Sequence, residues 1–90
     1  MNKVILFGNL EWCASCRKLH PIFTEVSKEM KDKFEFVDLD VESDEGVDLS
    51  TEYQVRNIPT IIVLSGDEVK ERITGTKTKE QLTEILEKYI

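Results

Sequence analysis

The sequence has few cysteines and no long apolar run near its start. Only two cysteines occur among 90 residues, too few for the disulfide framework that stabilises small secreted scaffolds. Residues 1–8 contain one lysine and a short apolar run that ends at Gly8, too short for a signal-peptide core or a membrane span. We therefore expect a protein that starts at Met1 and stays in the reducing cytoplasm.

Positive charge is also scarce. Twelve lysines and arginines face 18 aspartates and glutamates, so the net charge is −6, which argues against nucleic acid or an acidic membrane surface as partner. Residues 35–52 hold eight carboxylates and no lysine or arginine. This acidic run has two interpretations, a solvated face or a docking surface for a basic partner.

Repeats, linkers and low-complexity segments are absent, and 90 residues suffice for one hydrophobic core but not for two. We expect one domain over residues 1–90. Apolar spacing predicts strands at residues 3–8, 34–39, 61–64 and 68–73, and helices from about 13 to 30, 43 to 54 and 78 to 90.

Local signals refine these elements. Pro21 lies inside the first helix and predicts a kink rather than a stop, because the apolar periodicity continues past it. Gly46 weakens the second helix, whose expected inward residues are Val47, Leu49 and Tyr53. Thr78 and Gln81 have the spacing of a capping box at the start of the third helix.

The expected order is thus β-α-β-α-β-β-α. A long helix joins the first two strands, so they should be parallel, while the last two strands form an antiparallel hairpin. With helices on both faces of the sheet, this order predicts a three-layer α/β/α sandwich.

Cys13 and Cys16 lie at the junction between the first strand and the first helix. Two thiols separated by two residues there can close a small disulfide ring, and the helix start favours the thiolate of the first. Dithiol–disulfide exchange needs one attacking thiolate and a second thiol that resolves the mixed disulfide. We assign Cys13 as the nucleophile and Cys16 as the resolving thiol.

A zinc site is the alternative for these cysteines. Zinc takes about four ligands, and His20, the only histidine, gives a set of three with Cys13 and Cys16. We therefore expect no metal and interpret His20 as a surface residue whose positive form favours the thiolate.

Several features together resemble the thioredoxin family over nearly the whole chain. They are, in order, Trp12-Cys13-x-x-Cys16, Pro21, Ile58-Pro59-Thr60 before an apolar strand, the hairpin containing Gly66, Gly75, and the final amphipathic helix. The resemblance implies a four-stranded mixed sheet of order 2-1-3-4. It also implies an enzyme without a cofactor that reduces protein disulfides, takes part in electron transport and cell redox homeostasis, acts as a monomer, and is recharged by a thioredoxin reductase or similar donor.

The resemblance also assigns substrate-binding residues. Ile58–Pro59 should be a cis peptide bond that faces the cysteines, with the backbone of Ile58 offered to a substrate strand. Trp12 should flank the site, and Gly75 should leave a flat surface where the substrate docks.

Departures from the family pattern are informative. The chain begins on the strand that leads to Cys13, whereas thioredoxins have an earlier strand and helix, and the segment between Asp40 and Tyr53 is about one helical turn longer than usual. The Ala14-Ser15 pair replaces the usual Gly-Pro, so the reduction potential cannot be carried over.

The charges beneath the site also differ. Thioredoxins place a buried aspartate at the position of Phe7 and a lysine near Phe36. With both phenylalanine, the usual proton acceptor for Cys16 is missing. We hypothesise that resolution relies on water or Glu11, or is slower than in typical relatives.

Two other functions remain open. A glutaredoxin-like protein recharged by glutathione would keep the fold, although residues 65–68 continue into a hairpin instead of a Gly-Gly-x-x-Asp turn. A binding module with incidental cysteines is the third possibility.

Overall fold

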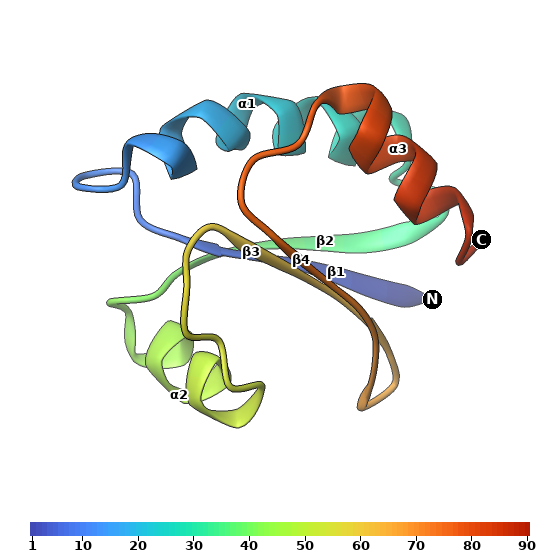
Figure 1. Cartoon of the computed structure of the whole chain (residues 1–90). Coiled ribbons are helices and arrows are strands. Elements are labelled where there is room, and N and C mark those ends of the chain that lie inside the picture. Colours follow the sequence, from blue (N-terminus) through green and yellow to red (C-terminus); the bar gives the residue numbers. More distant parts are fainter.

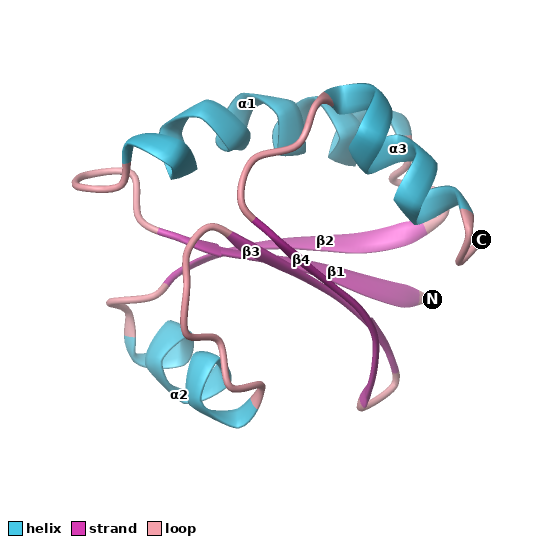
Figure 2. Ribbon diagram, viewed as in Figure 1, coloured by secondary structure: helices cyan, strands magenta, loops and turns pink.

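The computed structural model describes all 90 residues, which form a four-stranded sheet covered by helices on both faces (Figure 1). Figure 2 shows α1 and α3 together on one face and α2 alone on the other. The elements in chain order are β1 (Asn2–Gly8), α1 (Ala14–Glu29), β2 (Phe34–Asp40), α2 (Asp44–Glu52), β3 (Thr60–Ser65), β4 (Glu68–Thr74) and α3 (Lys79–Glu87). The predicted α/β/α sandwich is confirmed.

The sheet has the strand order β2-β1-β3-β4, as the resemblance implied. β1 pairs in parallel with β2 and antiparallel with β3, and β3 and β4 form the antiparallel hairpin. In the β1–β3 register Phe7 is opposite Thr60. The carboxyl end of β1, where the cysteine segment starts, therefore lies beside the start of β3.

Alternation along β1 creates two hydrophobic clusters, one on each side of the sheet. Val4 and Leu6 belong to a cluster of 12 buried residues that α1 and α3 cover. Ile5 and Phe7 belong to a cluster of five buried residues, against which α2 packs. β1 is therefore buried on both faces, as expected for a central strand.

The helix starts follow the sequence signals. At α3 the predicted capping box is present, because Thr78 Oγ1 accepts a hydrogen bond from the Gln81 amide at 3.1 Å and Gln81 Oε1 accepts one from the Thr78 amide at 3.0 Å. α1 continues through Pro21, as expected from its periodicity. No helix is long and apolar enough to cross a membrane.

Gly46 determines which face of α2 packs against the sheet. A Cβ atom there would lie 1.8 Å from the carbonyl oxygen of Asp40, so only glycine fits. With Gly46 facing the end of β2, Leu49 and Tyr53 pack toward the sheet, as predicted. The prediction for Val47 was wrong: its side chain is 49% exposed, because residue 47 is turned about 100° away from Gly46 around the helix.

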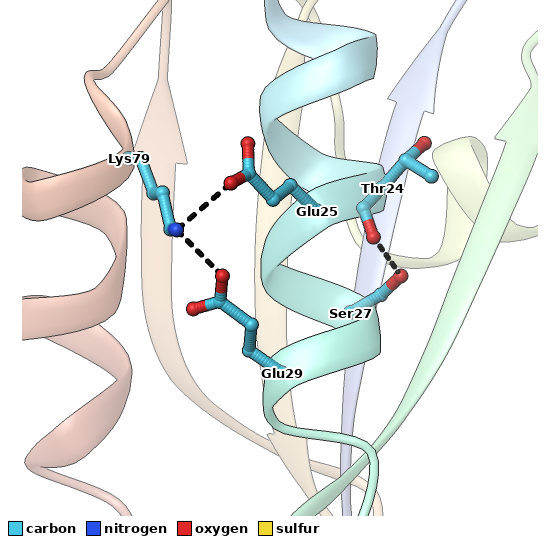
Figure 3. Close-up of polar contacts among 5 residues, drawn as sticks. All are labelled: Thr24, Glu25, Ser27, Glu29 and Lys79. Carbon is cyan, nitrogen blue, oxygen red and sulfur yellow. Dashed lines mark hydrogen bonds and ion pairs between the residues drawn. The ribbon is translucent and has the colours of Figure 1, made fainter.

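An ion pair links the two helices on the other face. Figure 3 shows Lys79 of α3 between two glutamates of α1, and its Nζ lies 2.9 Å from Glu25 Oε1 and also contacts Glu29. The hydrogen bonds that Lys79 donates to Glu29 and, with a smaller effect, to Glu25 raise the pKa of Lys79. The group is exposed, so burial of apolar side chains, and not this pair, holds the helices together.

Candidate functional site

Asn9 organises the segment between β1 and α1. Its side chain is 3% exposed, and its Oδ1 accepts hydrogen bonds from the amides of Glu11 and Trp12 at 2.9 and 3.1 Å. Its Nδ2 donates to Asp40 Oδ1 and to Glu42 Oε1, both at 3.2 Å. The segment that leads to Cys13 is thus fastened to the end of β2 by one side chain.

Asn9 is absent from the residues predicted for the site. The available signal was an asparagine directly after a buried strand, because asparagine side chains bond to backbone amides two residues on and favour turns. That signal indicates a turn but does not identify Asp40 and Glu42 as partners, which come from 31 and 33 residues further along the chain.

Cys13 is the N-cap residue of α1. Its backbone is extended, and its Sγ accepts a hydrogen bond from the Cys16 amide at 3.2 Å. An amide donor and the positive end of the helix dipole both stabilise negative charge on this sulfur. The electrostatics expected at a strand-to-helix junction are therefore present at Cys13.

Cys13 and Cys16 form a disulfide, with their Cα atoms 5.2 Å apart. Cys13 is 9% exposed and Cys16 only 2%, so the first sulfur is the more accessible. Gly8 makes room for the second, because a Cβ at Gly8 would lie 3.1 Å from Cys16 Sγ.

Trp12 is 58% exposed directly before Cys13. Its indole Nε1 donates a hydrogen bond to Glu42 Oε2 at 3.2 Å. Glu42 thus holds both Asn9 and Trp12, and at least one member of the acidic run has a structural partner near the cysteines.

The other predicted substrate-binding residues lie at the same end of the sheet. Ile58–Pro59 is a cis peptide bond, as the resemblance implied, and Pro59 precedes Thr60, the partner of Phe7. The Gly75 amide donates to the Pro59 carbonyl at 3.0 Å. Gly75 has a φ of 80° and open space where a side chain would be, which suits a residue at a docking surface.

The structure corrects the placement of Phe7 and Phe36. Phe7 is fully buried in the cluster on the α2 side, whereas Phe36 packs against the cluster under α1 and α3. Successive residues of a strand point to opposite faces, so it is Gly8, and not Phe7, that faces Cys16. The two phenylalanines therefore do not form a pair beneath the cysteines.

A cavity of about 230 Å³ adjoins Cys16. Its lining residues come from β1, the following loop, α1 and β2, and they are Leu6, Gly8, Asn9, Leu10, Glu11, Cys16, His20, Asp38 and Asp40. His20 Nε2 lies 2.6 Å from Asp38 Oδ2. His20, expected as a surface residue of the helix, is thus partly buried and lines the cavity next to Cys16.

Metal ligands do not gather at this site or elsewhere. The structure contains no group of three or more histidine, cysteine, aspartate or glutamate side chains arranged to hold a metal ion.

The comparisons with known proteins agree with this geometry. The family model described as Thioredoxin matches residues 2–88. A thioredoxin of Bacillus subtilis is 39% identical over 79 residues, which cover 88% of this chain and 74% of that protein. A thioredoxin of Mycoplasmoides gallisepticum is 37% identical over 84 residues, covering 93% and 81%.

Similarity extends to longer and more distant relatives. The chloroplastic thioredoxin M4 of Arabidopsis thaliana is 33% identical over 79 residues, which are 88% of this chain but only 40% of that protein. The crystal structure of the germline-specific thioredoxin Deadhead of Drosophila melanogaster has a TM-score of 0.86 at 22% identity, covering 99% of this chain and 81% of the other. At that identity the likeness shows a shared fold.

Proposed function

Because the chain belongs to the thioredoxin family and is a thiol–disulfide oxidoreductase, we propose that Cys13 is its nucleophile and Cys16 its resolving thiol, acting on protein disulfides. The observation that carries this proposal is the position of Cys13, at the N-cap of α1 and in a disulfide with Cys16. Cys13 is the more accessible of the two sulfurs and Cys16 the more buried, which suits an attacking thiolate followed by a resolving thiol.

The reaction starts from the dithiol. The Cys13 thiolate attacks one sulfur of a substrate disulfide, a mixed disulfide forms, and the other substrate sulfur leaves as a thiolate that takes up a proton. Cys16 then loses its proton and attacks Cys13 Sγ, which breaks the mixed disulfide and releases the second substrate thiolate. The substrate gains two electrons, and the protein is left with the Cys13–Cys16 disulfide.

Substrate binding is assigned to Trp12, Ile58, Pro59 and Gly75. The hydrogen bond between the Gly75 amide and the Pro59 carbonyl brings two of these residues together, and the register of β1 and β3 places them beside the end of the strand that leads to Cys13. An extended substrate segment would lie across this end of the sheet, between the exposed indole of Trp12 and the open surface at Gly75.

The electron donor and the compartment are part of the same proposal. Each turnover leaves the protein oxidised, so a donor must return two electrons, and a thioredoxin reductase is the proposed source. We place the protein in the cytoplasm as a monomer, where such a donor keeps thiols reduced.

Disulfide reduction in insulin tests the cysteine roles. Cys13→Ser should abolish the activity, whereas Cys16→Ser should accumulate a mixed disulfide at Cys13 that mass spectrometry detects. Activity retained in Cys13→Ser would contradict the assignment.

Recharging needs a separate test. The oxidised protein is incubated with NADPH and a thioredoxin reductase, or with glutathione alone. We expect the first mixture to restore the dithiol, and reduction by glutathione alone would instead favour a glutaredoxin-like donor.

A further inference from the structure

The cavity beside Cys16 places ionisable groups next to a thiol that must lose a proton. Its volume is about 230 Å³, which is roomy enough for water, and five of its nine lining residues have polar side chains that can bind one. Four of its lining side chains carry an acidic or basic group: Glu11 from the loop, His20 from α1, and Asp38 and Asp40 from β2. Arg17 of α1 does not line the cavity, but its Nη1 donates to the carbonyls of two lining residues, Leu10 and Glu11.

Helix geometry sets the relation between Cys16 and His20. They are four residues apart on α1, so their side chains share one face, with Cβ atoms about 5–6 Å apart. Both line the same cavity. One water molecule can span the gap between such neighbours.

Asp38 fixes the form of the imidazole. A carboxylate only accepts hydrogen bonds, so the 2.6 Å contact between Asp38 Oδ2 and His20 Nε2 requires a hydrogen on Nε2. In the neutral ring this leaves the lone pair on Nδ1. The ring is thus held in one tautomer with one nitrogen ready to accept a proton.

We propose that His20, held by Asp38, accepts through cavity water the proton that Cys16 loses when it resolves the mixed disulfide. The inference rests on the proposed function, since it names the proton acceptor for its second step. His20 becomes an imidazolium paired with Asp38, Cys16 attacks Cys13 Sγ, and the departing substrate thiolate takes up a proton. The ring then returns to its neutral form, so no proton is gained or lost by the site.

The cavity carboxylates are poorer acceptors. An imidazole is in general a stronger base than a carboxylate, so a neutral imidazole is the better acceptor for the proton of a thiol. Asp40 Oδ1 is already engaged by the Asn9 side chain and the Glu42 amide. Glu11, the acceptor considered from the sequence, is exposed, and its carboxylate makes no hydrogen bond or ion pair in the site.

A coloured aromatic disulfide separates the two steps. In single-turnover mixing of the reduced protein with bis(nitrobenzoate) disulfide, attack by Cys13 releases the first coloured thiolate and resolution by Cys16 releases the second. We expect His20→Gln to slow the second release about a hundredfold near neutral pH, at the low end of general-base effects. The dependence of this second release on pH should also become weaker, because the proposed acceptor is removed.

Matched variants isolate the proton transfer. Lys18→Gln removes a titratable cation from the same helix outside the cavity, and its second release should stay within about twofold of the original protein. Asp38→Asn tests the positioning residue and should slow the second release less than His20→Gln does. Added imidazole should restore the rate in His20→Ala, a rescue that a purely structural role would not give.

The possible results distinguish a failure of the role of His20 from a failure of the role of Cys13. An unchanged second release in His20→Gln, a loss in Glu11→Gln as large as that in His20→Gln, or no imidazole rescue in a folded His20→Ala would each overturn the role of His20. These results leave the first release intact. Absence of the first release in the original protein would instead contradict the proposed nucleophile Cys13.

Discussion

The two sides of the sheet differ in the size of their hydrophobic clusters and in whether they carry the cysteines. The side under α1 and α3 has a cluster of 12 buried residues and also carries both cysteines, His20 and the cavity. The side under α2 has a cluster of five buried residues, and none of its members lines that cavity. The comparison teaches that Phe7, although only six residues before Cys13, belongs to a part of the core that the chemistry does not touch.

The two sides are also held by different means. α1 and α3 bury whole aliphatic side chains, among them Leu19, Leu82 and Leu86. α2 is short and buries only one residue, Gly46, whose contact with the Asp40 carbonyl leaves no space for a side chain. Burial of apolar side chains therefore holds α1 and α3 on the sheet. α2 instead depends on the close approach of its backbone at Gly46 to the Asp40 carbonyl.

The largest expected effect comes from Phe7→Asp. The site is fully buried on the α2 side, so losing the ring and burying a carboxyl group should lower the free energy of unfolding by at least about 4 kcal/mol. Denaturant titration measures this loss. Where the variant stays folded, the pH dependence of the second thiolate release should be unchanged.

Phe7→Leu serves as its control. This substitution keeps the site apolar, so we expect a smaller loss in denaturant titration and an unaltered resolution rate. A faster resolution step in Phe7→Asp alone would show that the α2 side does communicate with Cys16.

Next in size is a pair of leucine truncations that compares the two clusters. Leu19→Ala, on the fully buried face of α1, should lower the free energy of unfolding by about 3 kcal/mol. Leu49→Ala removes a half-buried side chain of α2, and the loss should be about 1 kcal/mol. Equal losses in the free energy of unfolding, measured by denaturant titration, would contradict the expectation that the cluster under α1 and α3 contributes more stability.

Gly46→Ala sharpens the contrast in how the helices are held. Alanine is the better helix former, yet its Cβ would meet the Asp40 carbonyl at 1.8 Å. The required shift should lower the free energy of unfolding by about 2 kcal/mol. Asp48→Ala, at an exposed position of the same helix, is the control and should change stability little; a gain in Gly46→Ala would refute the close approach.

The smallest effect is expected at Lys79. Lys79→Met removes the exposed pair with Glu25 and Glu29, and the midpoint of thermal unfolding should fall by no more than about 3 °C. A calorimetric scan measures the midpoint, with Lys88→Met of the helix C-cap as the control. A much larger fall would mean that charge, and not burial, joins α1 to α3.

Much of the fold could be predicted because local signals and packing agree. The apolar run in β1, the capping box at Thr78 and the β-branched strand after Pro59 each indicate their element without reference to the others. The Cys13–Cys16 spacing likewise located the redox site. The prediction for Val47 was wrong because the contact of Gly46 with Asp40 decides which face of α2 packs on the sheet. The spacing of apolar residues does not reveal such a contact.

The remaining parts of the site depend on partners that are far apart in sequence. The contacts of Asn9 with Asp40 and Glu42, and of His20 with Asp38, join α1 and its preceding loop to β2. The parallel pairing of β1 with β2 brings these partners together. The contacts therefore depend on the strand register, which the residue types alone do not predict. Family position suggested that Phe7 lies beneath Cys16, but strand alternation turns its ring to the other face.

The bonds of Asn9 also have a consequence for amide hydrogen exchange. The amides of Glu11 and Trp12 lie in a loop outside any backbone ladder, yet both donate to the same side-chain oxygen. They should therefore exchange with deuterium more slowly than other loop amides and with the same protection factor, because a single opening of Asn9 exposes the two together. The loop before Cys13 thus behaves dynamically as one small cooperative unit.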